Sequence, residues 1–418
     1  MTASNHGPLA GITVLDFTRA VAGAYTTRLM ADMGARILKI EAPEAGEAIR
    51  YNNIDHPAIS KNVPPTLSPQ FVYSNAGKEC ICMDLKKPES IELIKRLVPL
   101  VDVVMENFTA HVMPSLGLSY DELSKIRPDI IMCSLTGFGQ EGPLANHPSN
   151  DSVGQAMGGM TYMTGEWDGY PVLAGNGIAD TATGTMAALA ILAAIIHRSK
   201  TGEGQYIDIA MMDTVMGLDC TGHPYYAASH GEYTVKRSAP DHFLLSPWGV
   251  YKGPNNRYFA LLSQWPRLCE VMGRPDLIDE PEFATPEARL ANRGKIRAII
   301  EPFLQSFESD DEAFQALIDA KIAAGPVLDP WEVQHHPQMA TRNAVREVPY
   351  PLGISYPTIA TPLHFSKTPI NVGRAPLIGE HNRSVLREFL DLSDEELDRL
   401  HAVGALYEDV TVKHLLEQ

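Results

Sequence analysis

Residues 12–40 read ITVLDFTRAVAGAYTTRLMADMGARILKI, and they give the clearest indication of the fold class. Ile12–Phe17 is a short apolar run rich in strand-forming residues. A helix-like segment follows over Ala24–Met33 and ends at Gly34, and Ile37–Ile40 forms the next apolar run. A strand, a helix and a second strand in this order predict two parallel strands joined by a crossover helix.

The same alternation continues to residue 135. Pro88 opens a helix with apolar residues at helical spacing, and the apolar run Val101–Met105 comes next. Ser119 and Glu122 then form a capping-box pattern ahead of the buried run Ile130–Cys133. Short apolar strands that alternate with helices are typical of a parallel sheet covered on both faces. We therefore predict a Rossmann-like α/β sheet.

The chain of 418 residues is long enough for two domains. We predict that residues 1–225 form the first part of a large Rossmann-like domain. Residues 240–335 form a smaller α+β domain, with a strand at Tyr258–Leu262 and helical segments near 265–272, 286–307 and 309–323. The stretch 225–257, rich in Pro, Gly, His and Tyr, reads as a linker or long loop. After a Pro-rich crossing, residues 350–418 return to the large domain.

Composition limits the classes of partner and the location. The net charge of −17 repels nucleic acid and anionic membrane surfaces, so neither is an expected partner. The five cysteines lack the spacing of metal ligands. Because their number is odd, they do not all form disulfides within the chain, which favours reduced thiols and a location inside the cell. The apolar stretch Met186–Ile196 is short for a bilayer and predicts a buried helix. The N-terminal residues show no signal-peptide pattern, so we expect a cytoplasmic protein.

The usual cofactor and catalytic motifs are missing from the sequence. Thr18–Gly23, after the first strand, holds a single glycine, so the dinucleotide-binding pattern GxGxxG is absent. The sequence also has no P-loop, no GxSxG and no HExxH. The doublet His335–His336 stands before Pro337 and reads as a solvated turn rather than a metal site. We predict no metal and no tightly bound cofactor.

Asp180 stands out by its context. It lies between the Gly-rich approach Gly175–Gly177 and the small-residue helix start Thr181–Gly184. A plain helix cap would explain an aspartate at this place. The same geometry suits a nucleophile, because the helix dipole would keep the carboxylate ionised and the small neighbours would admit a bulky thioester. The spacing of residues alone does not decide between a helix cap and a nucleophile.

Ordered matches along nearly the whole chain resemble the family III CoA-transferases, which include formyl-CoA and carnitine CoA-transferases. The segment Ile178–Asp180, continuing through Arg198 to Gln205, is the most specific because it contains the family's nucleophile. The other matching segments are Pro8–Thr18, Gly34–Glu41, Met105–Phe108, Leu135–Gln140, Asp151–Gly159, Ala324–Pro326 and Ala375–His381.

The resemblance implies a mechanism and an assembly. Asp180 would attack an acyl-CoA thioester to give a mixed anhydride, and the CoA thiolate would then form an aspartyl-CoA thioester. A free carboxylic acid would reverse these steps and leave as its CoA ester, without ATP or a metal. Backbone amides of the Gly-rich loops would stabilise the oxyanions. The family also implies an intertwined homodimer.

The resemblance also implies roles for individual residues. Lys78, Asn107 and Phe108 match contacts to CoA, and Met211 matches a residue near the bound thioester. Alone, Lys78 would be a surface lysine and Phe108 a core residue. Asp151 matches an acidic position near the active site, where it would equally serve as a turn cap. Arg19, Arg50 and Arg237 are our candidate cations for CoA or for a substrate carboxylate, since an arginine fork matches a carboxylate.

Several positions depart from the formyl-CoA transferase pattern. A glutamine after the first strand is replaced by Val21, a tryptophan by Asn52, and CoA-contacting arginines by Ala42 and Ser115. The tetraglycine loop of that subgroup has no counterpart. Exchange between formate and oxalate is therefore not expected, and the aromatic and proline residues of loops 50–65 and 220–245 suggest a larger acid.

Two other functions fit the sequence less well. The family contains 2-methylacyl-CoA racemases, which use the histidine of a Gly-His-Asp motif as a base. This chain has Ser149-Asn150-Asp151 at that place, and Asn150 cannot shuttle the proton. A non-catalytic CoA-binding protein would be expected to lack the nucleophile, and Asp180 is present.

Overall fold

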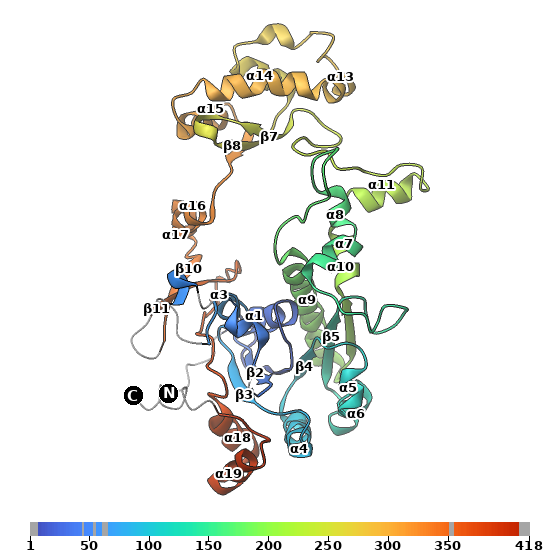
Figure 1. Ribbon diagram of the computed structural model, residues 1–418, viewed down its shortest axis with the longest axis vertical. Coiled ribbons are helices and arrows are strands. Elements are labelled where there is room, and N and C mark those ends of the chain that lie inside the picture. Colours follow the sequence, from blue (N-terminus) through green and yellow to red (C-terminus); the bar gives the residue numbers. More distant parts are fainter. Residues whose placement is uncertain (1–6, 44–45, 53–55, 61–65, 351–354, 409–418) are drawn as a thin grey trace. The chain divides into compact units, whose positions relative to one another are not determined.

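The computed structural model describes residues 7–43, 46–52, 56–60, 66–350 and 355–408. They form two compact units (Figure 1). Unit 1 contains residues 1–158, 175–218 and 337–418, and unit 2 contains residues 159–174 and 219–336. Each unit is described by itself.

Unit 1 is built around a six-stranded sheet in the order β3-β2-β1-β4-β5-β6 (Figure 1). Every adjacent pair in this sheet is parallel, which confirms the predicted mixed α/β fold with a parallel sheet. The strands are β1 (Thr13–Asp16), β2 (Arg36–Glu41), β3 (Glu79–Cys82), β4 (Val103–Glu106), β5 (Ile131–Thr136) and β6 (Tyr206–Ala210).

The helices of unit 1 connect these strands and extend beyond them. They are α1 (Ala22–Asp32), α2 (Pro57–Ser60), α3 (Pro69–Asn75), α4 (Pro88–Leu97), α5 (Val112–Ser115), α6 (Tyr120–Ile126), α7 (Asp151–Met157), α9 (Ile178–Thr201), α10 (Met211–Leu218), α17 (Pro337–Thr341), α18 (Asn382–Leu390) and α19 (Asp394–Ala402). Short 3₁₀ helices cover Ala48–Tyr51 and Val98–Leu100, and β10 (Val345–Pro349) pairs antiparallel with β11 (Ser355–Ile359).

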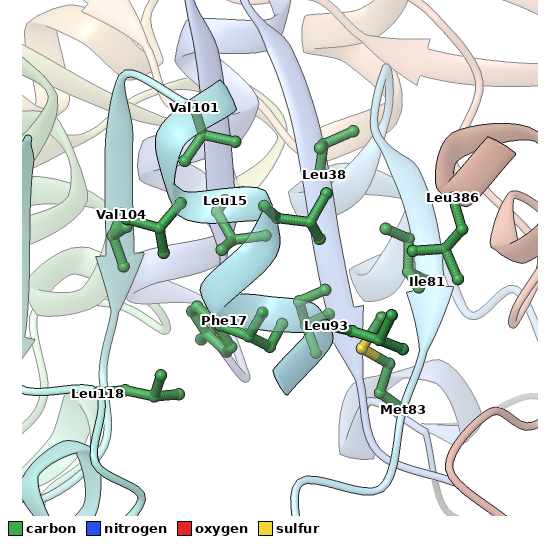
Figure 2. Packing of buried hydrophobic residues seen from close by; sticks show 14 of the residues in the cluster. Leu15, Phe17, Leu38, Ile81, Met83, Leu93, Val101, Val104, Leu118 and Leu386 are labelled. Carbon is green, nitrogen blue, oxygen red and sulfur yellow. The ribbon is translucent and has the colours of Figure 1, made fainter. Parts of the chain in front are cut away.

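The sheet of unit 1 is covered on both faces. Leu15 of β1 faces a buried apolar cluster that includes Leu93 of α4 and Leu386 of α18 (Figure 2). The next residue, Asp16, faces the opposite side, where its Oδ2 accepts a hydrogen bond from Thr27 of α1 at 2.6 Å. Successive strand residues point to opposite faces, so helices lie on both sides.

Unit 2 holds a three-stranded antiparallel sheet in the order β7-β8-β9 and a separate apolar core. Its strands are β7 (Trp248–Lys252), β8 (Tyr258–Leu262) and β9 (Ala323–Pro326). Its helices are α8 (Met160–Met163), α11 (Gly222–Ala228), α12 (Trp265–Val271), α13 (Pro286–Ala291), α14 (Arg293–Gln305), α15 (Asp310–Asp319) and α16 (Pro330–His335), with 3₁₀ helices at Pro254–Asn256 and Pro275–Leu277.

Three local predictions were wrong. The stretch 225–257, predicted to be a loop, contains the end of α11 and all of β7. The helix predicted over 286–307 is broken at Asn292, which ends α13 and precedes α14. The helix predicted over 309–323 ends at Asp319, because Lys321 turns with a φ of 56° and β9 begins at Ala323.

Helix α9 also differs from its prediction. It spans 24 residues, Ile178–Thr201, so Asp180 lies in its first turn rather than before it. Within the described part of the chain it is the one helix that is long and apolar enough to cross a membrane by length and composition alone. Only one side is buried, and Met186, Leu189 and Ile196 on the other side are 43%, 59% and 55% exposed.

Candidate active site

Asp180 is placed by the start of α9. Gly177 caps this helix with a φ of 79°, a left-handed conformation that favours glycine. Asp180 follows as the third helical residue and is half-buried. Its carboxylate therefore sits where backbone N–H groups of the first turn point outward, near the positive end of the helix dipole.

Asp151, the first residue of α7, caps α9 from a different helix. Its Oδ1 accepts hydrogen bonds from the backbone N–H groups of Ala179 at 2.8 Å and Asp180 at 3.3 Å. The buried Gln155 braces this arrangement, since its Nε2 donates to Asp151 Oδ2 at 2.8 Å and to the Gly175 carbonyl at 2.7 Å. The Gly-rich approach and the helix start are thereby held together.

The surroundings change the acidity of Asp180. Burial, and secondly the charge of Asp151, raise the pKa of the Asp180 carboxyl to about 6. The sequence predicted a carboxylate that the helix dipole keeps ionised. The pKa is nevertheless raised, mainly by burial and secondly because the cap brings a second negative charge to the helix end. Above pH 6 the carboxylate is still the major form.

Two glycines allow the close packing around this aspartate. A Cβ on Gly154 of α7 would lie 2.3 Å from Met211 Sδ and 3.3 Å from the Ala179 Cβ, so Met211 lies against the start of α9. A Cβ on Gly184 would lie 2.5 Å from the Ala22 carbonyl oxygen at the start of α1. Met211, Asp151 and Asp180 thus belong to one cluster, as the sequence had grouped them.

A second group of predicted residues meets at the carboxyl ends of β1 and β4. The Asn107 carboxamide forms two hydrogen bonds with the backbone of Arg19, since its Oδ1 accepts from the N–H at 2.7 Å and its Nδ2 donates to the carbonyl at 2.8 Å. The next residue, Ala20, has a φ of 58° and donates its N–H to Glu47 Oε1 at 2.8 Å. This loop is held in a defined conformation.

A cavity of about 280 Å³ lies beside this loop. Arg19, Phe17 and Phe108 line it together with Lys86, which follows β3. The site lies at the carboxyl edge of the sheet, where the strand order reverses between β1 and β4, and open α/β sheets bind ligands at such a point. Lys86 was not predicted as a site residue, although its position just after a buried strand could have indicated it.

The first turn of α1 joins the two groups. A Cβ on Gly23 would lie 3.3 Å from the Asn107 Cβ, while the neighbouring Ala22 carbonyl approaches Gly184 of α9. The cavity at Arg19 and the carboxylate at Asp180 are therefore connected through a single helix start within unit 1.

Three other candidate cations lie elsewhere or are fully engaged. The Lys78 side chain is buried, and its Nζ bonds Asp16 Oδ2, the Ala24 carbonyl and Asn75 Oδ1 at 2.9–3.1 Å, so it is not a surface lysine. Arg50 is buried in a two-pronged pair with Glu41, with both distances 2.7 Å. Arg237, in unit 2, donates to three carbonyl groups of residues 162–169.

Asn150 has a structural role. Its Oδ1 accepts a hydrogen bond from the Val153 N–H at 3.0 Å and so caps α7. An asparagine amide does not transfer protons as a histidine does, so this position offers no racemase base.

Known proteins resemble this chain over most of its length. The family model described as CoA-transferase family III matches residues 9–382. The chain belongs to CoA-transferase family III. This confirms the resemblance read from the sequence, and it makes the protein an enzyme that uses CoA thioesters as substrates.

Individual relatives cover nearly the same length. Succinate–glutarate CoA-transferase of Agrobacterium fabrum is 35% identical over 388 residues, which span 91% of this chain and 95% of that protein. Formyl-CoA:oxalate CoA-transferase of Rhodopseudomonas palustris is 32% identical over 421 residues, spanning 95% and 97%. The crystal structure of a CaiB/BaiF family protein from Brucella suis is 32% identical, with a TM-score of 0.81 over 92% of this chain and 100% of that chain.

Proposed function

We propose that this family III CoA-transferase moves CoA from an acyl-CoA to a free carboxylic acid through a covalent intermediate on Asp180. The observation that carries the proposal is the half-buried Asp180 in the first turn of α9, held by the Asp151 cap. Its carboxyl has a pKa raised to about 6 by burial, so it is largely ionised at neutral pH.

The proposed reaction exchanges acyl groups in four balanced steps. The Asp180 carboxylate attacks the thioester carbonyl and expels the CoA thiolate, which leaves a mixed anhydride. The thiolate attacks the aspartyl carbonyl, forms an aspartyl-CoA thioester and releases the donor acid. The acceptor carboxylate attacks this thioester and again expels the thiolate. The thiolate attacks the acyl carbonyl of the new anhydride, which yields the product acyl-CoA and restores Asp180.

We place CoA along the carboxyl edge of the sheet. The support is the cavity lined by Arg19, Lys86 and Phe108, with the loop of Arg19 fixed by Asn107. Arg19 and Lys86 are both exposed and can offer positive charge to phosphates. Three carboxylates also line this cavity, and two of them, Glu41 and Glu47, are paired with Arg50 and Lys39. Met211, beside Ala179, is suited to contact the reacting thioester. Lys78 would not contact CoA. Its buried ammonium group pairs with Asp16 and would support this edge of the sheet indirectly.

For the acid substrate we propose a small dicarboxylate of the size of succinate or glutarate. The support is the name of the relative that is 35% identical, a succinate–glutarate CoA-transferase. The residues Val21 and Asn52 depart from the formyl-CoA transferase pattern and argue against formate and oxalate. Succinyl-CoA with glutarate is therefore the first pair to assay.

The enzyme is proposed to work as a homodimer. The support is the apolar side of α9 that unit 1 leaves uncovered at Met186, Leu189 and Ile196. A second copy would bury these residues, which a soluble protein rarely exposes together. Light scattering after size exclusion should give twice the mass of 45.8 kDa. A monomeric mass would overturn the proposed homodimer.

We also propose a cytoplasmic location, supported by five free cysteines, four of them buried.

The covalent step is tested by trapping. The purified enzyme is incubated with acetyl-, succinyl- or butyryl-CoA, treated with hydroxylamine, digested and analysed by mass spectrometry. A hydroxamate should appear on the peptide that contains Asp180, and it should be lost in Asp180→Ala. Asp213→Ala, which changes an exposed aspartate on α10, should still be labelled. No adduct with any donor, together with deuterium exchange at the α-carbon of a 2-methylacyl-CoA, would contradict the covalent transfer mechanism and favour a racemase.

A further inference from the structure

Unit 2 contains a cavity of about 590 Å³ where β8 ends and α12 begins. Its apolar wall includes Leu262 and Ile322, and its polar groups include Ser263. A volume of this size lies within the range of small-molecule sites, about 300–1,000 Å³. All of its lining residues lie in unit 2, so it is distinct from the cluster around Asp180.

Three cations line this cavity: Arg267 of α12, Arg289 of α13, and Lys321 in the turn before β9. The described lining residues include no aspartate and no glutamate. The chain as a whole carries a net charge of −17, so a hollow with three positive charges and no carboxylate is unlike the rest of the molecule. Such a hollow concentrates anions from solution.

The three cations also lack carboxylate partners within the described residues. Arg267 Nη1 donates to the Lys321 carbonyl at 3.2 Å, which joins α12 to the turn and brings the two charges to the same rim. In the same unit, Arg274 pairs with Asp276 and Arg297 pairs with Asp241. These two arginines of unit 2 have carboxylate partners, and the three cations of the cavity differ from them in this respect.

Arg289 is the most fixed of the three. Its Nε donates to the Ser246 carbonyl at 3.2 Å, and its Nη1 donates to the carbonyls of Phe283 at 2.7 Å and Ala284 at 3.3 Å. Its Nη2 has no hydrogen bond to the described residues, so two N–H donors are left for a ligand. Burial lowers the pKa of Arg289, as expected for a charge without a close counter-ion, although Glu287 acts on it from outside the lining.

We infer that this cavity binds a small multianion, a dicarboxylate or a phosphate, between Arg267, Arg289 and Lys321. Three cations attract a ligand with two or more negative charges more strongly than a monoanion, and the fork of Arg289 suits a carboxylate or phosphate oxygen. The apolar wall at Leu262 and Ile322 suits a short methylene chain. The inference stands on unit 2 alone and does not depend on the transfer step at Asp180.

The test is isothermal titration calorimetry at fixed ionic strength, with succinate, inorganic phosphate and acetate as separate probes and no acyl-CoA present. Succinate or phosphate should bind saturably, and acetate at least about tenfold more weakly, because it carries one charge. If succinate binds and phosphate does not, the ligand is a dicarboxylate. The opposite order makes it a phosphate group.

Variants assign the binding to this cavity. Arg267→Met and Lys321→Met change exposed side chains, so the fold should persist, and each should weaken binding about tenfold or more. Arg274→Met removes an equal charge from the same unit outside the cavity and should leave binding unchanged. Arg289→Lys keeps the charge but removes the fork, and should weaken binding even if the protein is less stable.

Two outcomes would overturn the inference: no saturable binding of succinate or phosphate, or equal losses in Arg274→Met and Lys321→Met. The Asp180→Ala protein should bind the multianion as the native protein does. Failure of covalent labelling and failure of this binding are therefore separate results.

Discussion

The carboxylate of Asp151 caps the helix that carries Asp180, through hydrogen bonds from the Ala179 and Asp180 N–H groups at 2.8 and 3.3 Å. The two residues come from separate helices, α7 and α9. The cap has two opposite effects on the proposed nucleophile. It fixes the first turn of α9 in place, and it puts a negative charge close to the Asp180 carboxyl, which adds to the effect of burial on its pKa.

This relationship predicts the pH dependence of the enzyme. The Asp180 carboxyl has a pKa of about 6, and only the carboxylate attacks a thioester, so kcat/KM should rise with pH through about 6. Asp151→Asn keeps an oxygen that accepts both N–H bonds, removes the charge, and replaces the acceptor of the Gln155 Nε2 bond with an amide nitrogen. The midpoint of the pH profile should move to lower pH, and activity at pH 5 relative to pH 7 should rise about threefold.

Asp213→Asn is the matched control for this shift, because it removes one negative charge from an exposed position on α10. Its pH profile should coincide with that of the native enzyme. If Asp151→Asn leaves the midpoint unchanged, or moves it to higher pH, the charge of Asp151 does not act on the nucleophile.

The Arg19 loop depends on Asn107. Asn107→Ala removes both hydrogen bonds to the Arg19 backbone, at 2.7 and 2.8 Å, and should release the loop that lines the cavity with Phe108. KM for the acyl-CoA should rise about tenfold, with a smaller change in kcat, as expected for about 1.4 kcal/mol of lost binding. Steady-state kinetics at saturating acid measures both constants.

Asn107→Asp serves as the intermediate variant, because it keeps the acceptor for the Arg19 N–H and loses the donor. Its KM should lie between the native value and that of Asn107→Ala. Asn371→Ala, at an exposed position of unit 1, should leave KM unchanged. A KM for Asn107→Ala equal to the native value would show that the loop is fixed without this contact.

The buried Glu106 at the carboxyl end of β4 should make the free energy of unfolding depend on pH. It is 2% exposed and accepts the Phe108 N–H at 2.7 Å, and burial raises the pKa of its carboxyl to about 7. The unfolded chain loses this proton near the ordinary value of 4.5. Between these pH values the folded state binds more protons than the unfolded state, so this group lowers the free energy of unfolding as pH rises.

Glu106→Gln should remove that loss while keeping an acceptor for Phe108. Relative to the native protein, the variant should gain about 3 kcal/mol in free energy of unfolding between pH 4.5 and pH 8. Urea unfolding at the two pH values measures the gain. An equal change with pH in both proteins would mean that Glu106 is not the group responsible.

The fold was predictable where strands are buried on both faces, because such strands are continuous apolar runs. Ile37–Ile40 lies within β2, and the run Ile130–Cys133 leads directly into β5, which begins at Ile131. Strand β9 was missed because Ala323–Pro326 has no β-branched or aromatic residue. It is a strand by virtue of its pairing with β8, which is distant in sequence.

The site was predictable only in part, for a similar reason. Asp180 and its Gly-rich surroundings can be read locally, but a cap donated by a second helix cannot, since 28 residues separate Asp151 from Ala179. Lys78 and Arg50 are charged residues that a single sequence places at the surface by default. Their burial follows from Asp16 and Glu41, which come to them from neighbouring strands.

The buried pair of Arg50 and Glu41 leads to a final prediction. Both side chains are almost completely buried, at 0% and 1% exposure, and their two hydrogen bonds are each 2.7 Å long. Arg50→Met would leave the Glu41 carboxylate buried without its partner, which should cost about 3–5 kcal/mol in free energy of unfolding. The double variant Glu41→Gln/Arg50→Met should recover much of that loss, because no unpaired charge remains. Chemical denaturation of the two single variants and the double variant measures the coupling. If Arg50 instead binds substrate directly, Arg50→Met would keep its stability and raise KM, and the double variant would not restore activity.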